Sequence, residues 1–414
     1  MRKEALLEAK EGVIESVERL DTWIRTNGWA GYDPYDIKGH PLILRMMSNA
    51  HLRWPLSLVR QSVLNYTEYF PQASRRFLRI EPEINAKAMG LFASAYLALH
   101  RILGEESYLI QAQECLLWLE KNNSPGYLES CWGYPFDWQS LVLLPKGTPS
   151  AVVTSICAHA FWDFYEYTGD QTYLDVCQSA CRFFTRNLKV DCIDNDHLCF
   201  SYTPLDRFHV HNANLFVAEF LIRVGIEVGN SEWQQYGTSA LNYTLDAQNA
   251  DGSFYYWALS EKDNYSISNV TLRNIDHYHT GFVLRSLYSI YKGTQDSKVF
   301  KALTSGYKFY RDFLFEDMTV PKLKSDRLYP INIHSCAEAI LCMSTMSDLF
   351  PDAAEYAVNS ACWSISNMQD SDGYFYYLRN IDRAVKIPYI RWGQAWMMRA
   401  LAAILQTNGD DAIS

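Results

Sequence analysis

The hydrophobic and polar positions of the chain follow a pattern that repeats about every 60 residues. In each repeat, an almost wholly apolar stretch ends in a short turn, and an amphipathic stretch follows the turn. A glycine just past a helix end supplies the left-handed cap, and the polar residue after it caps the next helix. Each repeat is therefore predicted to be a helical hairpin. The turns fall at Gly104, Gly169, Gly229, Gly293, Pro351 and Gly409.

The two helices of each hairpin are predicted to have different surroundings. The helix before a turn is apolar on nearly every side, as in the stretch 282–291, and such a helix has to be buried in an inner layer. The helix after a turn carries apolar residues at three- and four-residue steps, as in the stretch 299–314, which is typical of an outer helix with one wet face. The inner helices are predicted to begin near residues 84, 149, 211, 278, 333 and 390.

The last turn, at Gly409, has no helix after it, but the N-terminus offers one. Residues 6–24 are amphipathic, and this stretch can serve as the outer helix of the last hairpin. An open ring would expose apolar faces, so closure is expected. The sequence thus predicts an all-α fold, an (α/α)6 toroid of six helical hairpins closed by the N-terminal helix, as one domain over residues 1–414. Residues 29–80 lie outside the count and are predicted to form an irregular cover over one rim.

Two amphipathic helices end in related segments, at residues 248–256 and 369–377. In both, a Gln precedes an Asp-Gly pair and a run of aromatic residues. Asp-Gly favours a tight turn. The segments are similar to the turns that staple the α/α toroids of terpene cyclases, so a structural role is predicted for them.

Composition narrows the functions open to the chain. A net charge of −10 disfavours a nucleic-acid partner, because no basic field is available. No apolar run is long enough for a membrane span. The opening residues lack the apolar stretch of a signal peptide, and the ten Cys form no CxxC pair, so a cytoplasmic location is expected. The 12 Trp and 28 Tyr favour an aromatic-lined cleft, although a large helical core also absorbs aromatic residues.

Candidate chemistry lies on the long connections from each outer helix to the next inner helix. In a toroid these connections share one rim, over the mouth of the funnel, and polar and aromatic residues gather on them. The catalytic candidates are Asp137, His209, His211, Asp276, His277, Tyr278 and His279, and the substrate-binding candidates are Trp132, Tyr134, Trp138, Arg207, Asn212, Arg273, His334, Arg391 and Trp392.

Three chemistries fit these residue types. The pairs His209-x-His211 and His277-x-His279 would suit a metal, but their spacing matches no known zinc pattern, so neither a metal nor another cofactor is predicted. Glycoside hydrolysis needs two carboxylates across a cleft, and Asp137, Asp206 and Asp276 are placed on suitable connections.

Uronate chemistry, meaning β-elimination or C5 epimerisation, needs other groups. An Arg or Asn neutralises the sugar carboxylate, and a His or Tyr then moves the acidified proton. The histidines and Tyr278 suit that transfer, Arg273 and Arg391 suit the carboxylate, and the tryptophans can stack on sugar faces. Hydrolysis and uronate chemistry both stay open at this point.

Several segments give the chain a family resemblance. They are residues 31–36 (GYDPYD), 131–138 (CWGYPFDW), 148–149, 276–282 (DHYHTGF) and 391–395 (RWGQA). On these segments the chain resembles toroid proteins encoded in bacterial exopolysaccharide clusters of the Vibrio-polysaccharide type. Some members carry a δ-aminolevulinate dehydratase label, which this sequence does not support because it has no βα alternation. More distantly, the plan is similar to unsaturated-uronyl hydrolases, polysaccharide lyases and glucuronyl C5-epimerases.

The resemblance implies glycan handling. The leading hypothesis is a carbohydrate-active enzyme that works on a uronate-containing polysaccharide or oligosaccharide by hydrolysis, elimination or epimerisation. One alternative is a non-catalytic glycan-binding or scaffold protein of polysaccharide assembly, and another is a toroid that handles isoprenoids. The sugar, its linkage and the oligomeric state stay open.

Overall fold

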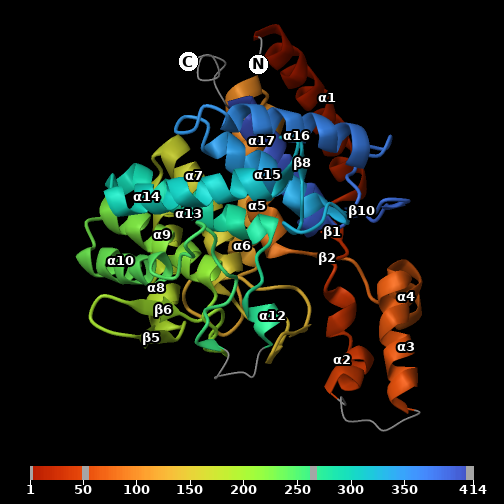
Figure 1. Cartoon of the computed structure of the whole chain (residues 1–414), viewed down its shortest axis with the longest axis horizontal. Helices are drawn as coiled ribbons and strands as arrows, with labels where there is room; N and C mark the ends of the chain where they lie inside the picture. The colour runs from red at the N-terminus through yellow and green to blue at the C-terminus, as the bar shows by residue number, and fades with distance from the viewer. Residues whose placement is uncertain (1–2, 49–55, 262–267, 407–414) are drawn as a thin grey trace.

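A computed structural model describes residues 3–48, 56–261 and 268–406, and most of them are helical (Figure 1). The inner helices begin within two residues of the predicted positions, counting the π-helical turn η2 (Ile390–Ala395) as the start of the sixth. They are α5 (Ala86–Leu103), α7 (Ala151–Thr168), α9 (His211–Glu227), α13 (His277–Thr294), α15 (Ile333–Thr345) and α17 (Trp396–Gln406).

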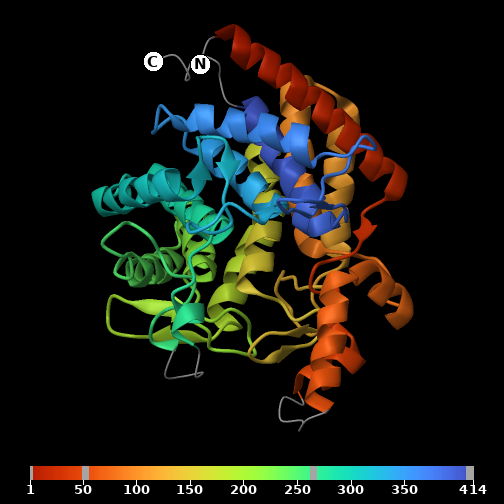
Figure 2. The same ribbon diagram turned by 45° about the vertical axis from the view of Figure 1, so that its right-hand side comes forward.

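The inner helices form a closed ring. Each contacts the next along the chain, and α17 returns to contact α5. The outer helices are α6 (Glu106–Lys121), α8 (Gln171–Arg186), α10 (Ser231–Leu245), α14 (Ser297–Phe313), α16 (Ala353–Met368) and the N-terminal α1 (Lys3–Asn27). Helix α1 packs on both α16 and α17, so it completes the sixth hairpin (Figure 2). The predicted α/α toroid, closed by the N-terminal helix, is confirmed.

The glycine turns follow the prediction at three places and depart from it at a fourth. Gly104, Gly169 and Gly229 have φ angles of 73°, 71° and 70°, the left-handed region. Gly293 lies inside α13, and Gln295 takes the left-handed position with φ 56°, so the role predicted for Gly293 is wrong. The reason is the cap of the next helix: the left-handed residue directly precedes the N-cap, which here is Asp296. Pro351 precedes α16, and Gly409 lies outside the described residues.

The two Asp-Gly segments staple one outer helix to the next. Gln248 Nε2 donates to the carbonyl oxygens of Gly252 and of Ala302 in α14, both at 2.9 Å. Gln369 Nε2 donates in the same way to Gly373, at 2.9 Å, and to Ser16 in α1, at 3.0 Å. Helix α1 is thus held by the same device as α14, although it comes from the other end of the chain.

Residues 29–80 form a short cover and a helical arm. Strand β1 (Ala30–Gly31) pairs antiparallel with β2 (Glu83–Ile84), and the 3-10 turn η1 (Asp36–Gly39) follows it. Helices α2 (Pro41–Ser48), α3 (Leu56–Tyr69) and α4 (Pro71–Leu78) then project as an arm beside the ring (Figures 1 and 2). Among the described residues of this stretch, η1 contacts β3 (Trp138–Gln139) at the ring, and α2, α3 and α4 form the arm.

Short strand pairs order the other connections on the mouth side. The pairs are β3 (Trp138–Gln139) with β4 (Leu143–Leu144), β5 (Val190–Cys192) with β6 (Leu198–Phe200), and β7 (Phe315–Glu316) with β8 (Val320–Pro321). A three-stranded sheet has β10 (Leu378–Arg379) between β9 (Ile331–Asn332) and β11 (Ala384–Val385). One short helix, α12 (Asn269–Leu272), lies among these connections. Within the described ranges, no helix combines the length and the apolar composition needed to cross a bilayer.

Candidate functional site

The first turns of the inner helices meet at one end of the ring, called the mouth from here on. Side-chain caps fix these turns: Asn85 accepts from the backbone N–H of Lys87, Asp276 from that of His279, and Asn332 from that of His334. The side chains of Lys87, His279 and His334 therefore start from rigid backbone, two or three residues after a cap. Such support favours a precise arrangement of functional groups.

His279 is oriented by a carboxylate. Its Nδ1 lies 2.8 Å from Asp276 Oδ2, and its ring lies between Tyr256 and Tyr278, each with a centroid distance of 4.4 Å. Burial by itself would raise the pKa of the Asp276 carboxyl, but the charge and hydrogen bonds of His279, helped by Lys324, bring that pKa below its ordinary value. The ionised carboxylate holds the proton on Nδ1, so Nε2 carries the free lone pair. The His279 side chain is 25% exposed.

His334 is a second imidazole at the mouth. Burial lowers its pKa well below the ordinary value, and the charges of Lys87 and Arg391 add to that effect. Nδ1 donates to the carbonyl oxygen of Trp392 at 3.2 Å, so Nε2 is again the unprotonated nitrogen. The rings of His334 and His279 contact Tyr278 at centroid distances of 4.8 and 4.4 Å. The two bases therefore flank one phenol.

Lys87 places an amine inside the lumen. It is only 3% exposed, and its Nζ lies 5.6 Å from the ring centre of Phe282 and 5.3 Å from that of Trp396. Among the described residues, no hydrogen bond or ion pair to this Nζ is found, and Asp33 and Glu338 attract it only from a longer distance. Burial lowers its pKa to about 7, with a further contribution from the charge of Arg391. The amine can therefore act in either protonation state near neutral pH.

Arg391 ties the cover to the mouth. Its guanidinium binds both carboxylate oxygens of Asp33, at 2.5 and 2.8 Å, and lies 5.0 Å from the ring centres of Tyr134 and Trp392. Tyr35, two residues after Asp33, packs edge-on against Trp392 at a centroid distance of 5.5 Å. This bidentate pair, almost completely buried, fixes the cover over one side of the mouth.

His277 and His211, two other catalytic candidates, lie in the core. His277 is fully buried, and its Nδ1 lies 3.0 Å from the hydroxyl of Tyr310 in the outer helix α14. Burial lowers the pKa of His277 to about 3, against the charge of Asp276, and that of His211 to about 4. His277 Nδ1 faces Tyr310 of α14, and the His211 ring stacks on Tyr243 of α10, so both rings face packing layers, away from the mouth.

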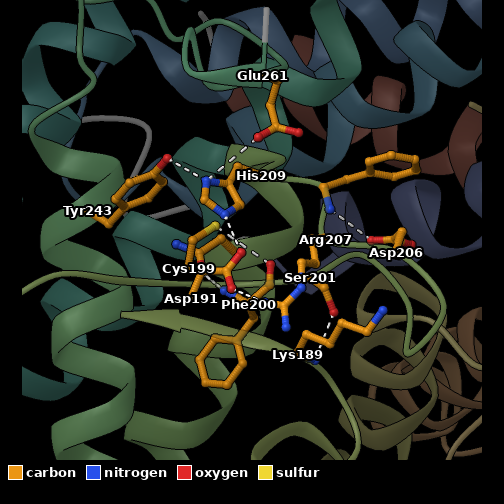
Figure 3. A network of polar contacts seen from close by, with 12 residues as sticks. Lys189, Asp191, Cys199, Phe200, Ser201, Asp206, Arg207, His209, Tyr243 and Glu261 are labelled. Atoms are coloured by element: carbon orange, nitrogen blue, oxygen red, sulfur yellow. Dashed lines mark hydrogen bonds and ion pairs between the residues drawn. The ribbon is translucent and has the colours of Figure 1, made fainter. Parts of the chain in front are cut away.

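His209 connects β5 to the segment that leads into α9, through its hydrogen bond to Asp191 (Figure 3). Its Nδ1 lies 2.9 Å from the hydroxyl of Tyr243 and its Nε2 lies 3.1 Å from Asp191 Oδ2, with Glu261 at 3.8 Å. Asp191 also pairs with Arg207. Both ring nitrogens are occupied, so His209 has no free base to offer.

The remaining candidates divide between the mouth and other places. Tyr134, Trp138 and Trp392 pack around Arg391 and Tyr35 at the mouth. Trp132 is 1% exposed and donates its indole N–H to Leu119, which places it in the core. The others serve local roles: Asp137 accepts from the backbone of Lys146, Asp206 accepts three bonds within its own loop, Arg207 pairs with Asp191, Arg273 is exposed, and Asn212 is buried beside His279.

Neither His-x-His pair converges on one point. His277 and His279 leave α13 in different directions, and both nitrogens of His209 are already bonded. Across the described part of the chain, no three His, Cys, Asp or Glu side chains come together as a metal site would need.

The structure adds residues that the sequence reasoning missed. Lys87 is the clearest, and its signal was visible: a lone lysine in the first turn of an otherwise apolar inner helix. Asp33 and Tyr35 lie in a segment singled out by resemblance alone. Tyr256 follows the first Asp-Gly turn, and nothing in the local sequence separates its role from that of its aromatic neighbours.

Comparisons with known proteins bear on the fold. No protein-family model and no curated protein sequence matches the chain. Among solved structures, cellobiose 2-epimerase from Bacillus thermoamylovorans is similar with a TM-score of 0.56 at 12% identity, over 78% of this chain and 88% of that one. An unsaturated glucuronyl hydrolase specific for heparin gives a TM-score of 0.58 at 11% identity, over 96% of both chains. A D-mannose isomerase gives 0.59 at 10% identity, over 78% and 87%. The chain shares the α/α-toroid fold of these enzymes.

Proposed function

We propose that this protein is a carbohydrate-active enzyme that moves a proton at a sugar carbon next to a carbonyl or carboxylate. The observation that carries the proposal is the pair of imidazoles, His279 and His334, which both contact Tyr278 at the mouth. In each ring Nδ1 faces an acceptor, so Nε2 is the nitrogen that can take a proton. General-base groups placed in this way are what C–H deprotonation requires.

The steps follow from these groups. His279 Nε2 takes the proton from the carbon, and the electron pair moves onto the adjacent carbonyl or carboxylate oxygen. Lys87, when protonated, stabilises that developing negative charge, and Tyr278 keeps its proton because burial raises its pKa, so its phenol can donate. Return of a proton gives an isomer or epimer, whereas departure of a β-substituent gives elimination. His334, which also contacts Tyr278, is the group that can return a proton to the opposite face of the carbon.

A uronate is the substrate class we favour. Among the described residues, no carboxylate lies within ion-pair distance of the Lys87 amine, so the amine can neutralise the substrate carboxylate that acidifies C5–H. The aromatic rings of Trp138 and Trp392 provide stacking faces at the mouth. Similar folds include enzymes named for unsaturated glucuronyl hydrolysis, polysaccharide lysis and sugar epimerisation, which supports this choice. A cytoplasmic role in exopolysaccharide biosynthesis is part of the same proposal.

Hydrolysis has less support from the geometry. A glycosidase needs two carboxyl groups facing the same bond. Asp276 is engaged with His279, Asp33 with Arg391, and Asp137 with a backbone N–H. These carboxylates are therefore committed to positioning.

Access to the site requires movement of the cover. The pocket bounded by His279, Asn212 and Tyr256 has a volume of about 10 Å³, which is enough for one water molecule and too small for a sugar ring. Tyr35 closes the mouth against Trp138 and Trp392. We infer that substrate enters when the Tyr35 ring shifts away from Trp138 and Trp392, while the Asp33–Arg391 pair holds the rest of the cover.

The test uses the purified chain and a panel of uronate-containing and neutral oligosaccharides. Three readouts separate the reactions: ultraviolet absorbance for an unsaturated product, deuterium uptake from D₂O for reversible proton transfer, and reducing ends for hydrolysis. Absorbance or deuterium uptake that disappears in His279→Gln supports the proposal. Reducing ends alone, unaffected by His279→Gln, would overturn it, and so would binding without any reaction.

A further inference from the structure

The lumen of the ring holds a second chamber below the mouth. It is a cavity of about 240 Å³, and all six inner helices line it with residues beyond their first turns or near their C-terminal ends. Each contributes one or more side chains, for example Ser94 (α5), Asp163 (α7), Arg223 (α9), Arg285 (α13), Thr345 (α15) and Arg399 (α17). This space, called the lower chamber below, takes no part in the proton transfer proposed above.

An aromatic floor separates the lower chamber from the mouth. The rings of Phe282 and Trp396 stack at a centroid distance of 5.4 Å. Lys87, in the first turn of α5, and Arg285, in the third turn of α13, both lie against these two rings at 5.3 to 5.9 Å. Arg285 lines the lower chamber and Lys87 does not, so a ligand there meets a different cation.

Most charges around the lower chamber are paired. Arg285 binds Glu338 with two hydrogen bonds, at 2.6 and 3.1 Å. Arg223 binds Glu219 at 2.6 Å, and the second carboxylate oxygen of Glu219 lies 2.8 Å from His159 Nε2. These pairs satisfy the buried charges that they contain.

Arg399 is the exception. Among the described residues it has no hydrogen bond and no ion pair, and its Nη1 is buried without a partner. The acidic group that attracts it, Asp163, lies beyond ion-pair distance, while Arg285 repels it. Burying Nη1 without a partner is costly, because a guanidinium N–H needs an acceptor. An oxyanion in the chamber would supply these acceptors in the fork geometry that guanidinium prefers.

We propose that the lower chamber binds a small polyhydroxylated anion, a sugar carrying a carboxylate or a phosphate, with its oxyanion on Arg399. The other lining groups fit the sugar: Ser94 and Thr345 offer hydroxyl oxygens, and Phe216 and Trp396 offer ring faces. The volume suits one sugar unit. The chamber is thus a monosaccharide site, distinct from the mouth.

Isothermal titration of the purified chain tests this with four probes: glucuronate, glucose 6-phosphate, glucose and inorganic phosphate. We expect one of the charged sugars to bind more tightly than both glucose and phosphate, and which one binds identifies the oxyanion. In Arg399→Met its Kd should rise about 10- to 100-fold, the value of one charged hydrogen-bonding group. Arg101→Met, at an exposed position of α5, is the matched control and should leave binding unchanged. If none of the probes binds, the proposal is overturned.

Two further variants locate the ligand and guard against misfolding. Lys87→Met removes the cation next to Phe282 and Trp396 and leaves Arg399 in place, so loss of binding in Lys87→Met with full binding in Arg399→Met would overturn the lower-chamber site. Asp163→Asn removes the acidic neighbour, and we expect it to tighten binding; a lower Tm with unchanged binding would show instead that Asp163 is the counter-ion of Arg399. Should Arg399→Met fail to fold, Ser94→Leu fills the chamber and must weaken binding if the site lies there. Catalysis at the mouth is assayed separately, so failure of either proposal leaves the other standing.

Discussion

Replacing Asp276 by Asn tests how His279 is activated. The carboxylate has two oxygens with separate tasks: Oδ1 accepts from the backbone N–H of His279 at 3.0 Å, and Oδ2 accepts from Nδ1 of the same residue at 2.8 Å and from Asn274 Nδ2 at 3.1 Å. An amide has one oxygen, so it can do only one of these tasks. The helix N–H cannot change, whereas an imidazole can move its proton between its nitrogens. We therefore expect the amide oxygen to keep the cap and the amide NH₂ to face Nδ1.

The consequence is a large effect on catalysis and a small one on stability. With NH₂ facing Nδ1, His279 carries its proton on Nε2 and loses the base at that atom. The expected fall in kcat is about 10²- to 10⁴-fold, the usual contribution of a general base. Asn caps helices nearly as well as Asp, so only the charge at the helix N-terminus is lost, which costs about 0.3–1 kcal/mol.

Nuclear magnetic resonance of ¹⁵N-histidine-labelled protein reads the tautomer directly, without a substrate. The wild type should show His279 protonated on Nδ1, and Asp276→Asn should show it protonated on Nε2. Asp276→Ala is the comparison that removes the cap as well, at about 1 kcal/mol. An unchanged tautomer in Asp276→Asn, or an unchanged rate with a changed tautomer, would refute the reasoning.

Three further outcomes are expected. Gly373→Ala puts a Cβ 2.2 Å from a backbone oxygen of α1 at φ 104°, so urea denaturation should show a loss of about 2–3 kcal/mol, whereas Gly12→Ala, where a Cβ meets nothing within 4 Å, should gain up to about 1 kcal/mol. Arg75→Met leaves the buried carboxylate of Asp36 unpaired, at a cost of about 3–5 kcal/mol, so limited proteolysis should cut near the helical arm of the mutant and spare the wild type. The pKa of Lys87 is about 7 in the folded state against an ordinary 10.5, so between pH 7 and 10.5 the folded protein binds fewer protons than the unfolded chain. The free energy of unfolding, relative to that of Lys87→Met, should therefore rise by up to about 1.4 kcal/mol per pH unit across this range and stay flat below pH 7. Equal slopes for both proteins would contradict the lowered pKa of Lys87.

Much of the ring could be predicted because its signals are local. A left-handed glycine such as Gly169, followed directly by the cap Asp170, fixes both a helix end and the next helix start. Where the cap moved, as at Asp296, the left-handed residue moved with it to Gln295. The Gln369 staple to α1 was recognisable as a motif, but its partner in α1 lies 353 residues away and needed the closed ring.

The site could be predicted less well, because the residues that reach it depend on the direction in which each side chain leaves its helix. His277 and His279 are two residues apart on one helix, so their side chains point in different directions, one to α14 and the other to the mouth. Sequence spacing cannot say which is which before the ring is built. Arg391 and Asp33 meet across 358 residues, and that contact depends on the cover folding back over the sixth inner helix.

The measurement that tests the central claim most directly is deuterium uptake into a uronate oligosaccharide in D₂O, followed by mass spectrometry with wild type, His279→Gln and His277→Gln. The account predicts uptake by the wild type, loss of about 10²-fold or more in His279→Gln, and a rate in folded His277→Gln close to that of the wild type, because His277 faces the core. No uptake by the wild type, or equal rates in wild type and His279→Gln, would contradict a proton-transferring role for the mouth.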